Sequence, residues 1–140
     1  MRQLRNRSRA LGLRAGTLLV AVIAGLFAVT GPTAAGEVDV LDAKAEKTDE
    51  GIYRFTVTLK HADTGWDHYA DRWDVVAPDG TVLGRRKLFH PHVDEQPFTR
   101  SLGNVRIPDG VTEVTIRGHD SVHGLGGKEM TIKLPTEKSS

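Results

Sequence analysis

The segment with the most distinctive chemistry in this sequence is the decapeptide 89–98, Phe-His-Pro-His-Val-Asp-Glu-Gln-Pro-Phe. Because proline donates no backbone hydrogen bond and fixes φ, its two prolines predict a stiff loop rather than a strand inside a sheet. In extended backbone, residues two apart point to the same face. His90 and His92 would then present two imidazoles to one metal or polar ligand, although such a pair is equally compatible with imidazoles that bond loop carbonyls or face solvent.

A second pair of histidines lies in the segment His119-Asp120-Ser121-Val122-His123. One helical turn would bring His119 and His123 together, since residues four apart share a face of a helix. Asp120 either orients an imidazole or caps the turn. The glycines that follow give the loop the freedom in φ to wrap a ligand, and they are equally expected in a plain hairpin.

The segment 66–73 adds His68 between acidic and aromatic residues. Its two tryptophans, Trp66 and Trp73, are more typical of a core than of a site. His61 is the weakest candidate among the histidines. The predicted metal ligands are His90, His92, His119, His123 and His68, with Glu95, Asp120 and Asp71 as supporting residues; ion pairs of Asp71 with Arg72 and of Glu95 with Arg100 are the alternative for two of these.

The donor types restrict the metal. The sequence has no cysteine, and beyond the N-terminal segment its one methionine is Met130, so soft Cu(I) or thiolate-bound zinc is not expected. Imidazoles with carboxylates suit Zn(II) or Cu(II), followed by Ni(II) and iron. We expect no enzymatic activity, because no nucleophile motif or phosphate loop is present. A metal-dependent hydrolysis is the alternative.

The first 35 residues have the three parts of a secretory signal peptide. A basic stretch without acidic residues precedes an apolar run from Thr17 to Val29, and Gly31-Pro32 and Thr33-Ala34-Ala35 follow. The apolar run is shorter than the roughly 20 residues of a spanning helix, so we predict cleavage after Ala35 rather than a retained anchor. The product would be periplasmic or secreted, without membrane insertion.

Charge bears on the partners. The chain has 19 basic and 18 acidic residues, and five basic residues but no acidic one precede residue 36. The segment from residue 36 onward therefore has 14 basic and 18 acidic residues, a net charge of −4. An acidic domain of this kind does not favour nucleic acid as a partner. The partners that we expect are a metal ion and another periplasmic or membrane protein.

The remaining chain reads as about seven short strands separated by Pro/Gly turns, with the clearest alternation at 53–60. This predicts an all-β fold, a single antiparallel β-sandwich of the immunoglobulin or fibronectin-III type at 36–135 followed by a disordered tail at 136–140. A small closed barrel is the alternative. Antiparallel connections alternate between two ends, so the loops 61–70, 90–97 and 119–128, which hold or adjoin all six histidines, should share one end.

The motifs His90-Pro91-His92-x-x-Glu95-Gln96-Pro97-Phe98 and His119-Asp120-x-x-His123-Gly124 resemble those of small exported Gram-negative bacterial proteins without an assigned function. The resemblance extends from Trp66 to Leu134 and implies export and a single β domain. The general pattern is also similar to periplasmic copper-handling sandwiches, whose methionine-rich motifs this sequence lacks.

These observations favour a periplasmic metal-binding β-sandwich that sequesters, delivers or senses Zn(II) or Cu(II). The alternative is a fibronectin-III-like interaction module that binds a protein or a small polar ligand without metal. Geometry distinguishes the two, because ligand nitrogens must converge to about 2 Å from one common point.

Overall fold

A computed structural model describes residues 36–140, and the predicted signal peptide at 1–35 lies outside the described residues. The described part of the chain is all-β and contains no helix. It therefore has no helix long and apolar enough to cross a membrane. The strands are β1 (Asp39–Asp49), β2 (Ile52–Lys60), β3 (Ala70–Val76), β4 (Val82–Lys87), β5 (Phe98–Arg106), β6 (Glu113–Asp120), β7 (Gly124–Leu125) and β8 (Met130–Lys133).

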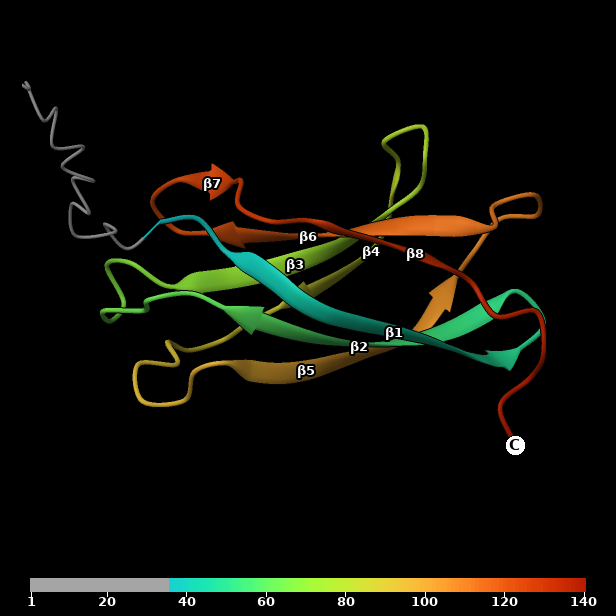
Figure 1. The fold of residues 1–140 in the computed structure, drawn as a ribbon, viewed down its shortest axis with the longest axis horizontal. Coiled ribbons are helices and arrows are strands. Elements are labelled where there is room, and N and C mark those ends of the chain that lie inside the picture. Colours follow the sequence, from blue (N-terminus) through green and yellow to red (C-terminus); the bar gives the residue numbers. More distant parts are fainter. Residues whose placement is uncertain (1–35) are drawn as a thin grey trace, which may run out of the picture. The chain divides into compact units, whose positions relative to one another are not determined.

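The strands form two antiparallel sheets packed face to face, as Figure 1 shows. One sheet has the order β1-β2-β5, and the other has the order β4-β3-β6, with β7 and β8 both paired to β6. An immunoglobulin-like sandwich divides its strands in this way. Here β1, β2 and β5 lie in one sheet, and β3, β6 and β8 lie in the other. The predicted fold is confirmed, and the two-residue strand β7 is the one element that the sequence did not indicate.

The core follows from the alternation of the strands. In β2, Tyr53, Phe55, Val57 and Leu59 are all buried, while Arg54 between them is exposed. Side chains in a strand point alternately to opposite faces, so this pattern turns one face of β2 toward the other sheet. Trp73 of β3 is fully buried between the sheets, as the sequence predicts.

A bulge interrupts the pairing of β2 with β5. Tyr53 pairs with Val105 and Phe55 with Leu102, so Gly103 and Asn104 together face a single residue of β2. Asn104 has φ of 56°, a conformation that asparagine tolerates better than most residues.

The C-terminal residues, for which the sequence predicts disorder, run beside β1. The backbone N–H of Ser139 donates to the carbonyl of Lys47 at 2.9 Å, and Lys138 forms a parallel bridge with the same residue. The Lys47 ammonium also donates to the carbonyl of Thr136 at 3.3 Å. These contacts extend the edge of the three-stranded sheet.

Gly118 of β6 packs closely against Val38, the residue just before β1. A Cβ atom on this residue of β6 would lie 2.4 Å from Cγ1 of Val38, which is fully buried. We expect Gly118→Ala to lower the free energy of unfolding by about 1–3 kcal/mol, because the added methyl overpacks the interface. Chemical denaturation measures the change.

The matched control is Gly103→Ala, where an added Cβ meets nothing within 4 Å. Its effect should stay within about 0.5 kcal/mol. Equal unfolding midpoints for the two variants would show that the approach of Gly118 to Val38 does not limit the packing of the sheets.

Candidate metal centre

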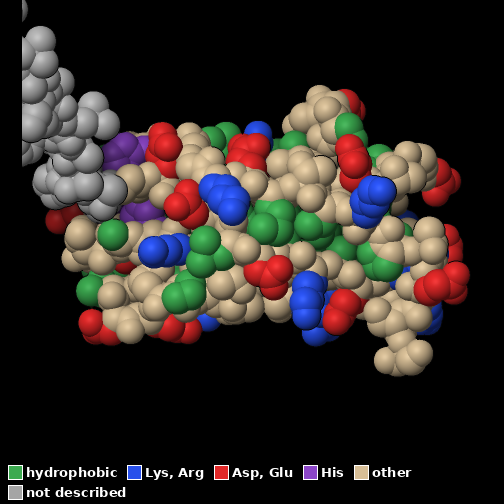
Figure 2. All heavy atoms as spheres, in the orientation of Figure 1, with side chains coloured by type: hydrophobic (Ala, Val, Ile, Leu, Met, Phe, Trp, Pro, Cys, Tyr) green, Lys and Arg blue, Asp and Glu red, His purple; other side chains and the backbone are tan. Residues whose placement is uncertain are grey.

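Three loops meet at one end of the sandwich (Figure 1). They connect β2 to β3, β4 to β5, and β6 to β8, and the short turns lie at the opposite end, as the sequence predicts. All six histidines lie in these three loops or beside them. On the face drawn in Figure 2, the visible imidazoles are also at this end.

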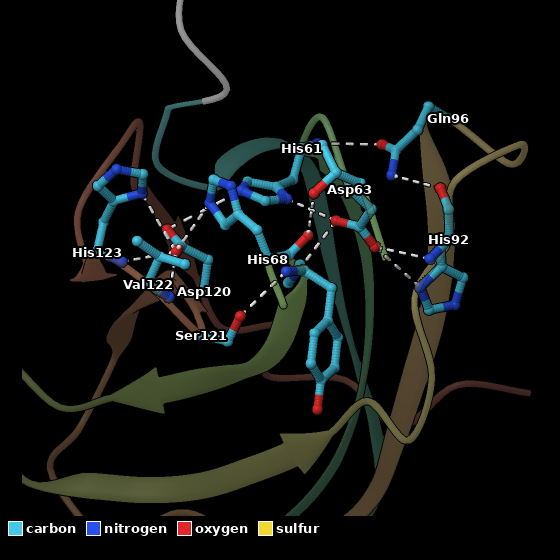
Figure 3. A network of polar contacts seen from close by, with 12 residues as sticks. His61, Asp63, His68, His92, Gln96, Asp120, Ser121, Val122 and His123 are labelled. Carbon is cyan, nitrogen blue, oxygen red and sulfur yellow. Dashed lines mark hydrogen bonds and ion pairs between the residues drawn. The ribbon is translucent and has the colours of Figure 1, made fainter. Parts of the chain in front are cut away.

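Within this end, His61, His68 and Asp120 come together (Figure 3). One ligand atom from each of the three lies within 4.8 Å of the other two, and among the described residues they form the only such group of three or more histidine, cysteine or acidic side chains. Nε2 of His68 is 3.2 Å from Oδ1 of Asp120, and Nε2 of His61 is 4.0 Å from Oδ2 of Asp120.

Strand pairing explains this convergence. Ala70, the first residue of β3, pairs with Asp120, the last residue of β6, so the loop before β3 lies against the end of β6. Within that loop the His68 N–H donates to the Gly65 carbonyl, and Gly65 has φ of 141°, which favours glycine. His61 follows directly after β2 and comes from the other sheet. The cluster therefore joins both sheets.

Asp63 orients His61. Its carboxylate lies 2.5 Å from Nδ1 of His61 and accepts hydrogen bonds from the backbone N–H groups of Ala70 (3.0 Å) and His92 (2.6 Å). Since an ionised carboxylate only accepts, Nδ1 of His61 donates to Asp63, and Nε2 faces the cluster. A carboxylate behind an imidazole in this way is the usual support of a metal-bound histidine.

Asp120 is fully buried, and burial alone would disfavour its charged form. The backbone N–H groups of Val122 (2.8 Å) and His123 (2.7 Å) both donate to Oδ1. Together with the nearby imidazoles of His123 and His61, these donors outweigh the burial and hold the pKa of Asp120 below its ordinary value. The residue is thus an anion at neutral pH, as a metal ligand must be.

His123 lies at the outer edge of the group. Its Nδ1 is 3.2 Å from Oδ1 of Asp120, and its ring centroid is 4.9 Å from that of His68. Its side chain is 40% exposed, whereas those of His61 and Asp120 have no exposed surface. The histidine is therefore placed between the buried cluster and solvent.

The facing atoms of the cluster are free for a ligand. Nε2 of His61, Nε2 of His68 and Oδ2 of Asp120 are buried without a hydrogen-bond partner of acceptable geometry among the described residues. On a tetrahedral ion with bonds of about 2.0–2.2 Å, ligand atoms lie about 3.3–3.6 Å apart. Nε2 of His61 is 4.0 Å from Oδ2 of Asp120, and the ligand atoms of the group lie within 4.8 Å of one another, so side-chain shifts on the order of 1 Å reach this spacing.

Two imidazoles and one carboxylate form a donor set used by Zn(II), by Cu(II) and by non-haem iron. Three protein ligands leave a further coordination position, which a fourth side chain or a small molecule fills.

Of the five predicted ligands, His68 is in the group and His123 borders it. His90 and His92 are outside it, although their rings lie 4.5 Å apart. His90 is exposed, and its Nδ1 is 3.0 Å from the carbonyl of Pro91. His92 is buried and stacks on Phe98, with centroids 3.9 Å apart and planes 4° apart. His92 reaches the cluster only through Asp63.

His119 does not take part, because β6 continues through Asp120 instead of giving way to a helical turn. Consecutive strand residues point to opposite faces, so His119 faces away from the core, where its Nδ1 is 2.5 Å from the predicted supporting residue Asp71. Glu95 pairs with Arg100 at 3.0 Å, and this hydrogen bond lowers its pKa. Asp120, predicted as support, is itself a candidate ligand.

His61 and Asp63 are the members that sequence reasoning undervalued, yet the alternation of β2 indicates them. The inward positions 53, 55, 57 and 59 continue to 61 and 63, and both residues are buried. The same holds in β6, where the buried positions 114, 116 and 118 continue to Asp120. The sequence signal for these site residues was therefore a polar residue at the end of a series of alternating, inward-facing strand positions.

Comparisons with known proteins add one relative. A protein of Halomicrobium mukohataei that bears the name "Putative lipoprotein" is 44% identical to this chain over 96 residues. The aligned region covers 69% of this chain and 47% of that protein, so the chain spans about half the length of the curated relative it matches. No family model matches the chain, and no solved structure gives a significant match.

The burial of His92 predicts a pH dependence of stability. Burial, followed by the positive charges of Arg100 and His90, lowers its pKa below the ordinary value of about 6.5. Below that value the unfolded chain binds a proton that the folded chain resists, so the free energy of unfolding falls as pH drops from 7 through the pKa of folded His92.

We expect His92→Phe, which keeps the stack on Phe98, to lose less stability between pH 7 and pH 5 than the wild type. Urea denaturation across this pH range measures the difference. His90→Ala, which removes an exposed imidazole from the same loop, should follow the wild-type curve. If His92→Phe retains the full pH dependence of stability, other titrating groups cause that dependence.

Proposed function

We propose that this chain is an exported metal-binding β-sandwich protein in which His61, His68 and Asp120 bind one Zn(II) or Cu(II) ion. The observation that carries the proposal is the convergence of buried His61 and half-buried His68 from the β2–β3 loop with buried Asp120 at the end of β6, each with an unpartnered atom facing the others. A buried polar atom without a partner costs free energy, and a bound cation would satisfy all three at once.

His123 is the fourth ligand in this proposal. Its Nδ1 already lies 3.2 Å from Oδ1 of Asp120, and its backbone N–H is bonded to the same oxygen. A ligand that is 40% exposed provides a route by which the ion exchanges with solvent or with another protein. This supports sequestration or delivery of the metal over a purely structural role, in which all four ligands are normally enclosed.

Export rests on two observations. The N-terminal sequence has the basic, apolar and small-residue parts of a signal peptide. The relative from Halomicrobium mukohataei carries the word lipoprotein in its name.

Metal titration of the exported protein tests the site. We expect the wild type to bind about one equivalent of Zn(II) or Cu(II) and to gain about 2.7 kcal/mol of stability at a free metal concentration 100 times the dissociation constant. His68→Ala should lose most of this affinity, because it removes a ligand whose side chain is only 15% exposed. Calorimetry and thermal unfolding with and without a chelator give both values.

His90→Ala is the matched control, since it removes an exposed imidazole at the same end without touching the group. It should bind metal as the wild type does. A wild-type protein that neither contains nor takes up Zn(II) or Cu(II) would overturn the proposal and favour the metal-free interaction module. Equal losses in the two variants would reject the assigned ligands.

The supporting role of Asp63 gives a second test. Asp63→Asn keeps the size of the side chain but removes the charge behind His61, and an amide nitrogen in place of one oxygen cannot accept its hydrogen bonds. We expect metal affinity to fall about 10–100-fold with the stoichiometry unchanged. Unchanged affinity in a folded variant would reject the supporting role of Asp63.

A further inference from the structure

A second candidate site lies on the other side of Asp63 from the metal group. An open groove with a volume of about 590 Å³ runs between the turn at Gly65-Trp66 and the His-Pro-His loop. Trp66, His90, His92, Val93, Asp94 and Glu95 line it, and no lysine or arginine does. The predicted ligand pair His90 and His92 therefore lies in a different site from the metal group.

His92 is the polar group at the base of this groove. It is only 3% exposed, and neither Nδ1 nor Nε2 has a hydrogen-bond partner among the described residues. The stack on Phe98 fixes the plane of the ring. Because burial favours the neutral imidazole, one ring nitrogen is an acceptor at neutral pH. Nδ1 lies 3.8 Å from Oδ2 of Asp63, which leaves Nε2 to form a hydrogen bond with a ligand.

The rest of the lining indicates the charge of that ligand. Trp66 is 67% exposed, with its ring held edge-on against Tyr69 at 5.6 Å between centroids. An exposed indole attracts cations through its negative face. Asp94 and Glu95 contribute two carboxylates, of which Glu95 is paired with Arg100. An aromatic face, a carboxylate and a neutral acceptor all favour a cation that carries N–H groups.

We propose that this groove binds a protonated amine or guanidinium group on a short carbon chain. The cation would lie over the indole of Trp66 and beside the Asp94 carboxylate, and it would donate a hydrogen bond to His92. Such a group occurs both in free small amines and in the lysine or arginine side chains of a polypeptide. The proposal does not depend on metal binding, because none of the three metal ligands lines the groove.

The test uses N-acetyl-arginine amide and its citrulline counterpart, in which a neutral urea replaces the guanidinium at nearly the same size. Binding to the exported protein is followed by fluorescence, since Trp73 is fully buried and Trp66 is the exposed one of the two tryptophans. We expect the arginine compound to bind at least about fivefold more tightly. Removing the indole in Trp66→Leu, measured by calorimetry, should weaken binding about two- to fivefold.

Asp94→Asn should also weaken binding, whereas Asp109→Asn, which removes one exposed carboxylate at the opposite end, should not. His68→Ala should keep the binding, so failure of the metal site and failure of the groove are distinguishable. Tighter binding of a capped Gly-Arg-Gly peptide than of the amide would favour a polypeptide ligand, and equal binding would favour a small free ligand recognised by its cationic group alone. Equal binding of the citrulline compound, or no binding of either compound, would overturn the proposal.

Discussion

Two buried carboxylates, Asp63 and Asp120, determine how the loop end of this protein is built. An ionised carboxylate removed from water costs several kcal/mol unless hydrogen bonds and opposite charges replace its hydration. Each of the two accepts two backbone N–H groups, and each has at least one imidazole beside it. Because these donors come from all three loops, satisfying the carboxylates also fixes the loops relative to one another.

The loop that carries His92 depends on this arrangement most directly. The Gln96 side chain accepts from the backbone N–H of His61 at 3.0 Å and donates to the carbonyl of His92 at 3.0 Å. With Asp63, these bonds close a ring between the segment after β2 and the segment before β5. The His61–His68–Asp120 group and the groove lined by His92 therefore lie on either side of one hydrogen-bonded wall, and no side chain belongs to both.

The fold was predictable from the sequence, because alternation, turn residues and the antiparallel connections are local signals that agree with one another. The end of the molecule that holds the histidines followed from the same reasoning. The identity of the residues in the site did not follow from the sequence, since spacing along the chain ranks His90 and His119 above His61. Which imidazoles converge depends on strand register, and the pairing of Ala70 with Asp120 is a contact between distant segments. The inward-facing positions of β2, continued to His61 and Asp63, would have identified these two residues of the site.

The wide separation of the metal group along the chain has a consequence for when an ion can enter. His61 and His68 precede Asp120 by more than two complete strands, and β3 must pair with β6 before the carboxylate meets the imidazoles. An extended chain offers these side chains as isolated, weak donors, so affinity arises only with the finished tertiary structure. If the proposed ion binds, a chain exported unfolded would acquire it at its destination, and the metal supply of that compartment, rather than of the cytoplasm, would decide which ion it holds.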